Sequence, residues 1–279
     1  MTTTLRPTGP LQQSADGTLS RAYEVCVNSR PVGAVRVATA PGFGRALGTI
    51  SDLRIDDADR RRGRGTVAAL AAEEVLRGWR CRLVRVSVPA EAAVALRLAT
   101  ALGYTERGRT MTRALAEGAA PGEPGAPGQE TAVRPMRDEE YEPWWTAAED
   151  AYVRVWGARG IAGDTARAKA RADRARLLPD GLASRGTRLY VAEAADGAPV
   201  GHLWLGLGPA AYVWDVEMAA GRRGEGHGRA LMRHAERTAR EAGADTISLH
   251  VFSDNTPALR LYESLGYRTT HIQLDKRLY

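Results

Sequence analysis

Two stretches of this chain, residues 88–104 and 251–267, are near copies of each other. Aligned without a gap, eight of their seventeen residues are identical: Val88, Ala95, Leu96, Arg97, Leu98, Leu102, Gly103 and Tyr104 each match their counterpart in the second stretch. Self-similarity of this kind indicates that one supersecondary unit is built twice. The sequence therefore predicts two copies of one fold rather than two unrelated α/β domains.

A segment between the copies separates them. Residues 117–130 contain four glycines and three prolines, a composition that favours a linker over a helix or a central strand. We therefore predict a first copy at 1–116, a linker at 117–130 and a second copy at 131–279. In the first copy, the expected strands lie near 4–6, 22–28, 32–38, 48–55, 81–88 and 109–114, and the expected helices near 66–79 and 91–102.

The second copy repeats this order with additions. A strand at 131–135 is expected to lead into helices over about 138–178, a region that the first copy lacks. A hairpin across Asp196-Gly197, strands at 212–218 and 246–252, and helices at about 228–242 and from Asn255 follow. The predicted class is α/β, with a mixed sheet flanked by helices in each copy.

A glycine-rich loop precedes the helix at 228–242. It reads Arg223-Gly224-Glu225-Gly226-His227-Gly228 and is followed by Arg229. Glycine allows a sharp turn and a close approach of the backbone to a ligand. The unpaired N–H groups and the dipole of the helix N-terminus favour an anion, most often a phosphate. Arg222, Arg223 and Arg229 add positive charge around the loop.

Two motifs carry a family resemblance. Arg223-x-x-Gly226-x-Gly228 resembles the acyl-CoA pyrophosphate loop of the GNAT acetyltransferase superfamily, and Asn255-x6-Tyr262 resembles that superfamily's second signature. The resemblance covers about residues 131–279. It implies an acetyl-CoA-dependent N-acetyltransferase in which a primary amine attacks the thioester directly. The cofactor-binding residues that it implies are Val216, Met218, Arg223, Gly224, Glu225, Gly226, His227, Gly228, Arg229 and Asn255.

The resemblance also implies catalytic roles. Tyr262 fits the general acid that protonates the departing thiolate, and the Met218 amide fits the donor to the thioester oxygen. The base stays open: Glu217 is favoured narrowly over His250 and then Asp215, with water as a further alternative. Among Tyr141, Trp144, Trp145, Tyr152 and Trp156, most are expected in the core and one or two in an acceptor pocket. His202, His234 and His271 show no metal spacing, so no metal is expected.

The first copy is expected to be non-catalytic. Aligned on the glycines, Arg62 stands opposite Arg223, Gly65 opposite Gly226, and Val67 opposite Gly228. In the alignment of 88–104 with 251–267, which differs from the glycine alignment by two residues, Ala92 and Ala99 replace Asn255 and Tyr262. Ala99 has no hydroxyl to give a proton, and Val67 would block a pyrophosphate. The alternative is weak cofactor binding through Arg62–Gly65.

The sequence leaves alternatives to an N-acetyltransferase and also indicates which partners are expected. A non-catalytic acyl-CoA sensor is one alternative, and acetylation of a cysteinyl-sugar amine, as in mycothiol synthase, is a lower one. The acceptor is expected to be a small-molecule or peptide amine. The chain carries a net charge of +6, but Asp56, Asp57 and Asp59 offset Arg60–Arg64, so nucleic acid is not expected. Two cysteines without metal spacing and no long apolar stretch favour a cytoplasmic protein with no membrane partner. A monomer, with the two copies as an internal pseudo-dimer, is favoured over a homodimer.

Overall fold

The computed structural model describes residues 2–115 and 131–278, so the predicted linker at 117–130 lies outside the described residues. The chain divides into two compact units. Unit 1 comprises Met1–Arg107, Asp150–Ala172 and Ile272–Tyr279, and unit 2 comprises Gly108–Glu149 and Asp173–His271. The units therefore interleave the two sequence copies, because each unit includes a segment from the other copy.

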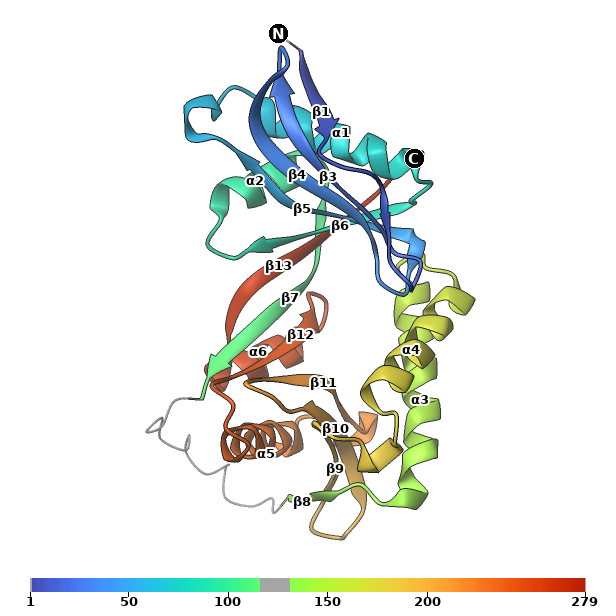
Figure 1. The fold of residues 1–279 in the computed structure, drawn as a ribbon. Helices are drawn as coiled ribbons and strands as arrows, with labels where there is room; N and C mark the ends of the chain where they lie inside the picture. Colours follow the sequence, from blue (N-terminus) through green and yellow to red (C-terminus); the bar gives the residue numbers. More distant parts are fainter. Residues whose placement is uncertain (1, 116–130, 279) are drawn as a thin grey trace. The chain divides into compact units, whose positions relative to one another are not determined.

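The first copy supplies most of unit 1 (Figure 1). Its elements are β1 Thr3–Pro7, β2 Gln12–Gln13, β3 Leu19–Val27, β4 Arg30–Ala40, β5 Gly44–Ile55, α1 Arg64–Gly78, β6 Leu83–Pro89 and α2 Ala93–Ala101. The strand order is β1-β3-β4-β5-β6. All pairs are antiparallel except β5 with β6, which are parallel. In α1, Ala68, Ala72 and Leu76 recur at helical spacing and are fully buried against the valines of the sheet.

The second copy follows the predicted order, and the mixed sheet with flanking helices confirms the predicted class. Its elements are β8 Ala132–Pro135, α3 Asp138–Gly157, α4 Gly163–Leu177, β9 Thr187–Glu193, β10 Pro199–Gly206, β11 Ala210–Met218, α5 His227–Glu241, β12 Thr246–Phe252, α6 Thr256–Ser264 and β13 Arg268–Arg277. In unit 2 the strand order is β7-β12-β11-β10-β9-β8, where β7 is Thr105–Ala114.

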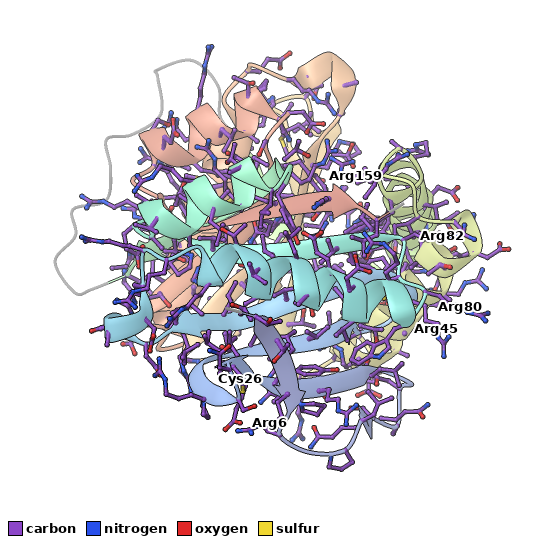
Figure 2. The ribbon with its side chains drawn as sticks, turned by 90° about the horizontal axis from the view of Figure 1, so that it is seen from above. Arg6, Cys26, Arg45, Arg80, Arg82 and Arg159 are labelled. Carbon is purple, nitrogen blue, oxygen red and sulfur yellow. The ribbon has the colours of Figure 1, made fainter. Side chains whose placement is uncertain are left out.

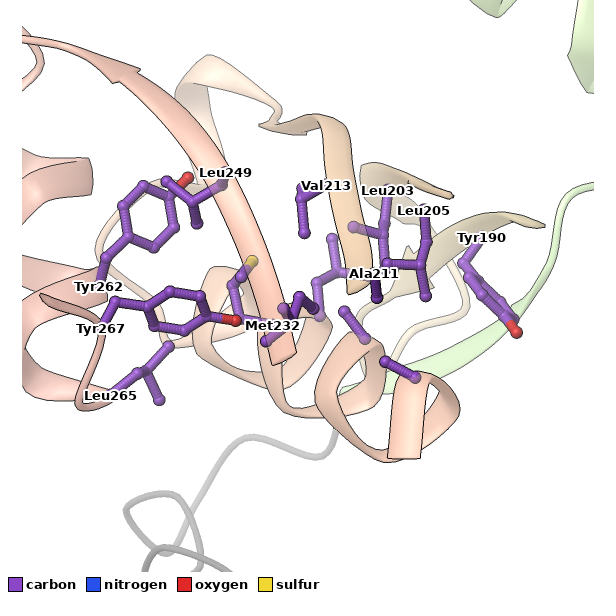
Figure 3. Packing of buried hydrophobic residues seen from close by; sticks show 14 of the residues in the cluster. Tyr190, Leu203, Leu205, Ala211, Val213, Met232, Leu249, Tyr262, Leu265 and Tyr267 are labelled. Carbon is purple, nitrogen blue, oxygen red and sulfur yellow. The ribbon is translucent and has the colours of Figure 1, made fainter. Parts of the chain in front are cut away.

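The core of unit 2 lies between one face of this sheet and the helices α5 and α6. Figure 3 shows Leu203, Val213 and Leu249 directed from the strands into this cluster, with Met232 of α5 and Tyr262 of α6. Alternate residues of a strand face opposite sides of a sheet. His202 and Trp204 therefore face the other side of β10, where Trp144 of α3 lies against both rings.

The last strand of each copy pairs outside its own copy. We expected the strand near 109–114 to complete the first copy, but β7 pairs antiparallel with β12 over Gly108–Ala114. In unit 2, Arg113 of this strand pairs with buried Glu236 at 2.6 Å. In unit 1, Lys276 of β13 pairs with buried Glu73 at 2.7 Å. The order of elements predicts a strand but not its partner, which is why this expectation was wrong.

Both cysteines are free and buried. Burial raises the pKa of Cys81 to about 11, so this thiol stays protonated near neutral pH. Figure 2 shows Arg45, Arg80 and Arg82 extending outward from unit 1. Among residues 2–115 and 131–278, no His, Cys, Asp and Glu side chains group in a way that could hold a metal ion. In the same residues no helix is both long and apolar enough to cross a membrane.

Candidate active site

The site of unit 2 is built where two parallel strands separate. The ladder between β11 and β12 joins residues 210–213 to residues 246–249. β11 then continues to Met218 and β12 to Phe252 without pairing with each other, while β12 pairs with β7 along its whole opposite edge. Within the described residues, the second half of β11 thus has a strand neighbour only on its β10 side. The backbone groups on its other side are left for a ligand.

A β-bulge in β11 coincides with the point of separation. Trp204 of β10 stands opposite Asp215, whereas the next residue, Leu205, stands opposite Val213, so Trp214 is the extra residue. Bulges bend a strand and re-aim its side chains, and they are common beside active sites. Beyond the bulge, Asp215 and Glu217 lie on the same face as Trp204 and His202.

The backbone of the free half of β11 has a defined direction. The Ala219 amide donates to the Val200 carbonyl at 2.9 Å. Hydrogen-bonded and non-hydrogen-bonded pairs alternate along an antiparallel ladder. The pairs Met218:Gly201 and Val216:Leu203 are therefore non-hydrogen-bonded pairs. The N–H groups of Met218 and Val216 thus point away from β10. This direction suits the predicted amide contacts of Val216 and Met218.

The glycine-rich loop follows directly after β11. Gly226 is the N-cap of α5 and has φ 89°, in the left-handed region that favours glycine, and Gly224 has φ 84°. The Arg223 Nε donates to the Met218 carbonyl at 3.4 Å and leaves the side chain 63% exposed. The Arg229 guanidinium donates to the Ser264 hydroxyl at 2.7 Å. The loop thus presents a helix N-terminus flanked by arginines.

Two loop side chains hold the loop itself. His227 is 2% exposed, with Nδ1 2.8 Å from the Thr131 hydroxyl and Nε2 3.2 Å from a Glu225 oxygen. Glu225 also accepts from Arg222 Nε at 3.0 Å, and this arginine holds the pKa of Glu225 below its usual range. The side chains of His227 and Glu225 are thus engaged within the loop. The predicted cofactor contacts of these two residues would be made by their backbone groups. The sequence gives no sign that His227 is buried.

Tyr262 lies on α6, with its ring beside Leu249 of β12 (Figure 3). It is 6% exposed. Burial, and then the charge of Asp215, raise the pKa of Tyr262 to about 12.

Asn255 caps α6, since its side-chain oxygen accepts from the Ala258 amide at 3.3 Å. Replacing it with alanine is expected to lower the free energy of unfolding by about 1 kcal/mol, because one helix N–H loses its partner. Asn255→Asp should keep the cap, yet it should weaken acetyl-CoA binding through its negative charge. Urea unfolding and calorimetric titration of both variants separate the two roles. If Asn255→Asp binds acetyl-CoA normally, the predicted cofactor contact is wrong.

The candidate bases differ in their positions. Glu217 is exposed, and its carboxylate lies 3.7 Å from Arg223. Asp215 lies 2.8 Å from Nε2 of His202, a residue that the sequence interpretation considered only for metal spacing. His250 lies on β12 with its ring against β7, because a Cβ at Gly108 would sit 2.5 Å from Nε2 of His250. Since β7 and β11 flank β12 on opposite sides, this ring is directed away from the free half of β11.

Aromatic side chains line the same face as Asp215. Trp144 contacts His202 and Trp204, with ring centroids 6.0 and 5.7 Å apart. Trp214, the bulge residue, is 41% exposed beside Trp204 and Tyr212. Trp156 instead packs on Phe43 in the core of unit 1. Of the aromatic residues predicted near an acceptor, Trp144 is therefore the one placed at His202.

The first copy keeps the same backbone framework. β5 and β6 pair only over residues 47–49 and 83–85, and the Arg60 Nε donates to the Ile55 carbonyl as Arg223 does to Met218. The N-cap of α1 is Gly63, with φ 73°. A Cβ on Gly65 would lie 3.7 Å from Leu98, and one on Gly228 would lie 3.4 Å from Leu261, the residue that matches Leu98 in the repeat.

These matches correct the predicted alignment of the two loops. Gly63 corresponds to Gly226, and Gly65 corresponds to Gly228, in the same frame as the 88–104 repeat. The glycine spacing was misleading because Arg61 adopts a left-handed φ of 60° where the second copy has Gly224. Val67 is therefore an exposed residue of α1 and blocks nothing in the loop.

The copies differ in side chains at the separated strands. The repeat places Ala99 where Tyr262 stands, and the loop frame places Arg54 where Glu217 stands. Asp52, the counterpart of Asp215, lies 3.6 Å from Arg36. In the first-copy loop, Arg64 is buried and pairs with Asp59, which also accepts both Arg30 nitrogens. The first copy thus lacks the hydroxyl and carries Arg54 in place of one of the two carboxylates.

Comparison with known proteins identifies this framework. The sequence matches the Acetyltransferase (GNAT) family over residues 5–104 and again over 132–267. The chain therefore belongs to the GNAT family, with two copies of its fold, and is an acyltransferase by family.

Three similar proteins illustrate the relation to the GNAT family. An uncharacterised N-acetyltransferase of Bacillus subtilis, YycN, is 31% identical over 107 residues, which is 37% of this chain and 69% of that protein. The streptothricin acetyltransferase of Streptomyces lavendulae is 38% identical over 96 residues, which is 33% of this chain and 50% of that protein. A tandem GNAT protein from the clavulanic acid biosynthesis pathway shares the fold, with a TM-score of 0.52, 20% identity, and coverage of 95% of this chain and 85% of that one.

Proposed function

We propose that this chain is an acetyl-CoA-dependent N-acetyltransferase whose reaction takes place in the second copy. The observation that carries this proposal is the buried Tyr262 on α6, beside a β11 whose second half has no β12 neighbour. In the first copy, Ala99 replaces the hydroxyl while the backbone framework is kept. Catalysis thus depends on a hydroxyl that only the second copy has.

The residues present fit an acyl-CoA. The helix N-terminus at Gly226 and the arginines Arg223 and Arg229 suit the pyrophosphate. The N–H groups of Val216 and Met218 suit the pantetheine amide and the thioester oxygen. A hydrogen-bond donor aimed at a developing oxyanion stabilises the transition state of acyl transfer by about 3–4 kcal/mol.

Tyr262 supplies the proton for the leaving thiolate. Its pKa of about 12 keeps the phenol protonated near neutral pH. The same burial and the nearby Asp215 charge also destabilise a thiolate formed beside it, which favours transfer of the proton to sulfur. In this reaction the amine attacks the thioester directly, and no side chain carries the acetyl group.

The test is a screen of primary amines with the full chain. Polyamines, amino sugars and short peptides are offered with acetyl-CoA, and the released thiol and the acetylated product are both measured. The proposal predicts acetylation of at least one amine. A chain that binds acetyl-CoA and acetylates none would instead be the non-catalytic sensor.

We further propose that the chain acts as a monomer. β7 from the first copy already pairs with β12, so the second copy needs no strand from another molecule. Sedimentation equilibrium of the full chain is expected to give the mass of one chain over the micromolar range. A concentration-independent dimer mass would contradict the proposal.

A further inference from the structure

His202 and Asp215 form a hydrogen-bonded pair on the face of β10 and β11 that also carries Trp204 and Glu217. His202 lies on β10 and Asp215 on β11, two residues apart diagonally across the ladder. Their Nε2 and Oδ2 atoms are 2.8 Å apart. The side chains are 22% and 35% exposed, so the pair is sheltered and still reachable by a small molecule.

The chemistry of the contact fixes which nitrogen is basic. An aspartate that is ionised near neutral pH can only accept a hydrogen bond. Nε2 of a neutral His202 ring therefore carries the hydrogen, and Nδ1 carries the lone pair. Among residues 2–115 and 131–278, His202 Nδ1 has no hydrogen-bond partner. This nitrogen is free to accept a proton.

The surroundings of the ring hold its orientation. Trp144 of α3 packs edge-on against it, with centroids 6.0 Å apart. On β11, the ionisable groups that face it are Asp215 and Glu217, the latter directly opposite in register. On β9, the residue opposite is Val191, which carries no charge. The charged side chains that face the ring from β11 are thus both carboxylates.

We propose that His202 is the base that accepts the proton of the acceptor ammonium and that Asp215 is its positioning residue. This inference rests on the proposed acetyl transfer. The ammonium N–H bond breaks, and its proton goes to His202 Nδ1. The freed amine lone pair then forms the C–N bond while the C–S bond breaks, and the thiolate takes a proton from Tyr262. The acylated nitrogen loses its second proton through solvent to the Tyr262 phenolate, which restores the phenol. The imidazolium finally returns its proton to solvent.

The position of the pair distinguishes it from the other candidates. The pair joins β10 to the half of β11 that β12 leaves unpaired. The His250 ring is directed toward β7, and Glu217 is exposed beside Arg223. In the first copy, Ala34 stands opposite Arg54, so no histidine occupies the equivalent place.

The first experiment measures kcat/KM against pH for the full chain, with acetyl-CoA and the best amine from the screen. The variants are His202→Asn, Glu217→Gln and His250→Asn, with His271→Asn as an exposed control outside the site. For His202→Asn, we expect kcat to fall about 100-fold and the decline of activity at low pH to disappear, because a general base contributes about 10²–10⁴-fold. The KM for acetyl-CoA should stay within about twofold, since the base does not contact the cofactor.

A normal pH profile in His202→Asn, with loss of the low-pH decline in Glu217→Gln or His250→Asn, would overturn the assignment while leaving the acetyltransferase function intact.

The second experiment determines the tautomer of His202 in the pair and does not depend on turnover. ¹⁵N-labelled histidine NMR of the full chain reports which nitrogen of neutral His202 carries hydrogen. We expect hydrogen on Nε2 in the wild type and a mixture of tautomers in Asp215→Ala. Hydrogen on Nδ1 in the wild type would overturn the inference. The Nε2–H form in a chain that acetylates no amine would overturn the catalytic role together with the proposed function.

Discussion

Replacing Tyr262 with phenylalanine is expected to slow acetyl transfer by about 100-fold or more, because general acid catalysis contributes about 10²–10⁴-fold. The ring remains, so packing against Leu249 and Tyr267 is kept and only the hydroxyl is lost. Acetyl-CoA affinity should therefore change little. The measurements are steady-state turnover with the best amine and calorimetric titration of acetyl-CoA.

Tyr104→Phe is the matched control, since Tyr104 is a buried tyrosine of unit 1 outside the proposed site. Its turnover should equal that of the wild type. Wild-type turnover in Tyr262→Phe would remove this residue from the mechanism. A loss of acetyl-CoA binding in Tyr262→Phe would instead show a role in the shape of the site.

Replacing Gly226 with valine is expected to weaken acetyl-CoA binding by about tenfold or more. Gly226 has φ 89°, and a non-glycine residue in the left-handed region costs about 1–2 kcal/mol, with a β-branched residue at the high end. The loop can relieve this strain only by moving the first N–H groups of α5 away from the anion. Calorimetric titration of acetyl-CoA measures the effect.

Gly63→Val provides the control for backbone strain. Gly63 is the N-cap of α1 with φ 73°, so the same substitution strains an equivalent helix start in unit 1. Both variants should lose similar stability in urea unfolding, but only Gly226→Val should lose turnover. A loss of turnover confined to Gly63→Val would move the working cofactor site to the first copy.

The sequence was sufficient where local patterns decide the structure. The glycine loop at 223–228, the capped helix at Asn255 and the hairpin at Asp196-Gly197 all form as predicted. Each is specified by residues that are close together in the chain, through left-handed glycines, a helix cap and a tight turn. The 88–104 repeat likewise predicted that the fold occurs twice.

The sequence was insufficient where distant residues decide the structure. Nothing in Arg109–Ala114 shows that this strand pairs with β12 rather than within the first copy. Arg61 shows that a non-glycine residue can take the left-handed turn, which shifted the predicted loop alignment by two residues. Local composition cannot report either effect.

His202 was missed for a related reason. Its role depends on the register of β10 against β11 and on the bulge at Trp214, neither of which the sequence specifies. One signal was available. His202 and Trp204 alternate with Leu203 and Leu205, so the polar and aromatic pair shares one face of the strand. That pattern places His202 beside Asp215 once the two strands are paired.

The central claim is that the second copy holds and uses the acetyl donor. A crystal structure of the full chain with acetyl-CoA tests it most directly. The account predicts the pyrophosphate against residues 223–228 and the thioester between β11 and β12, within hydrogen-bond distance of the Met218 amide. Acetyl-CoA bound only at the Arg60–Gly65 loop of the first copy would contradict it.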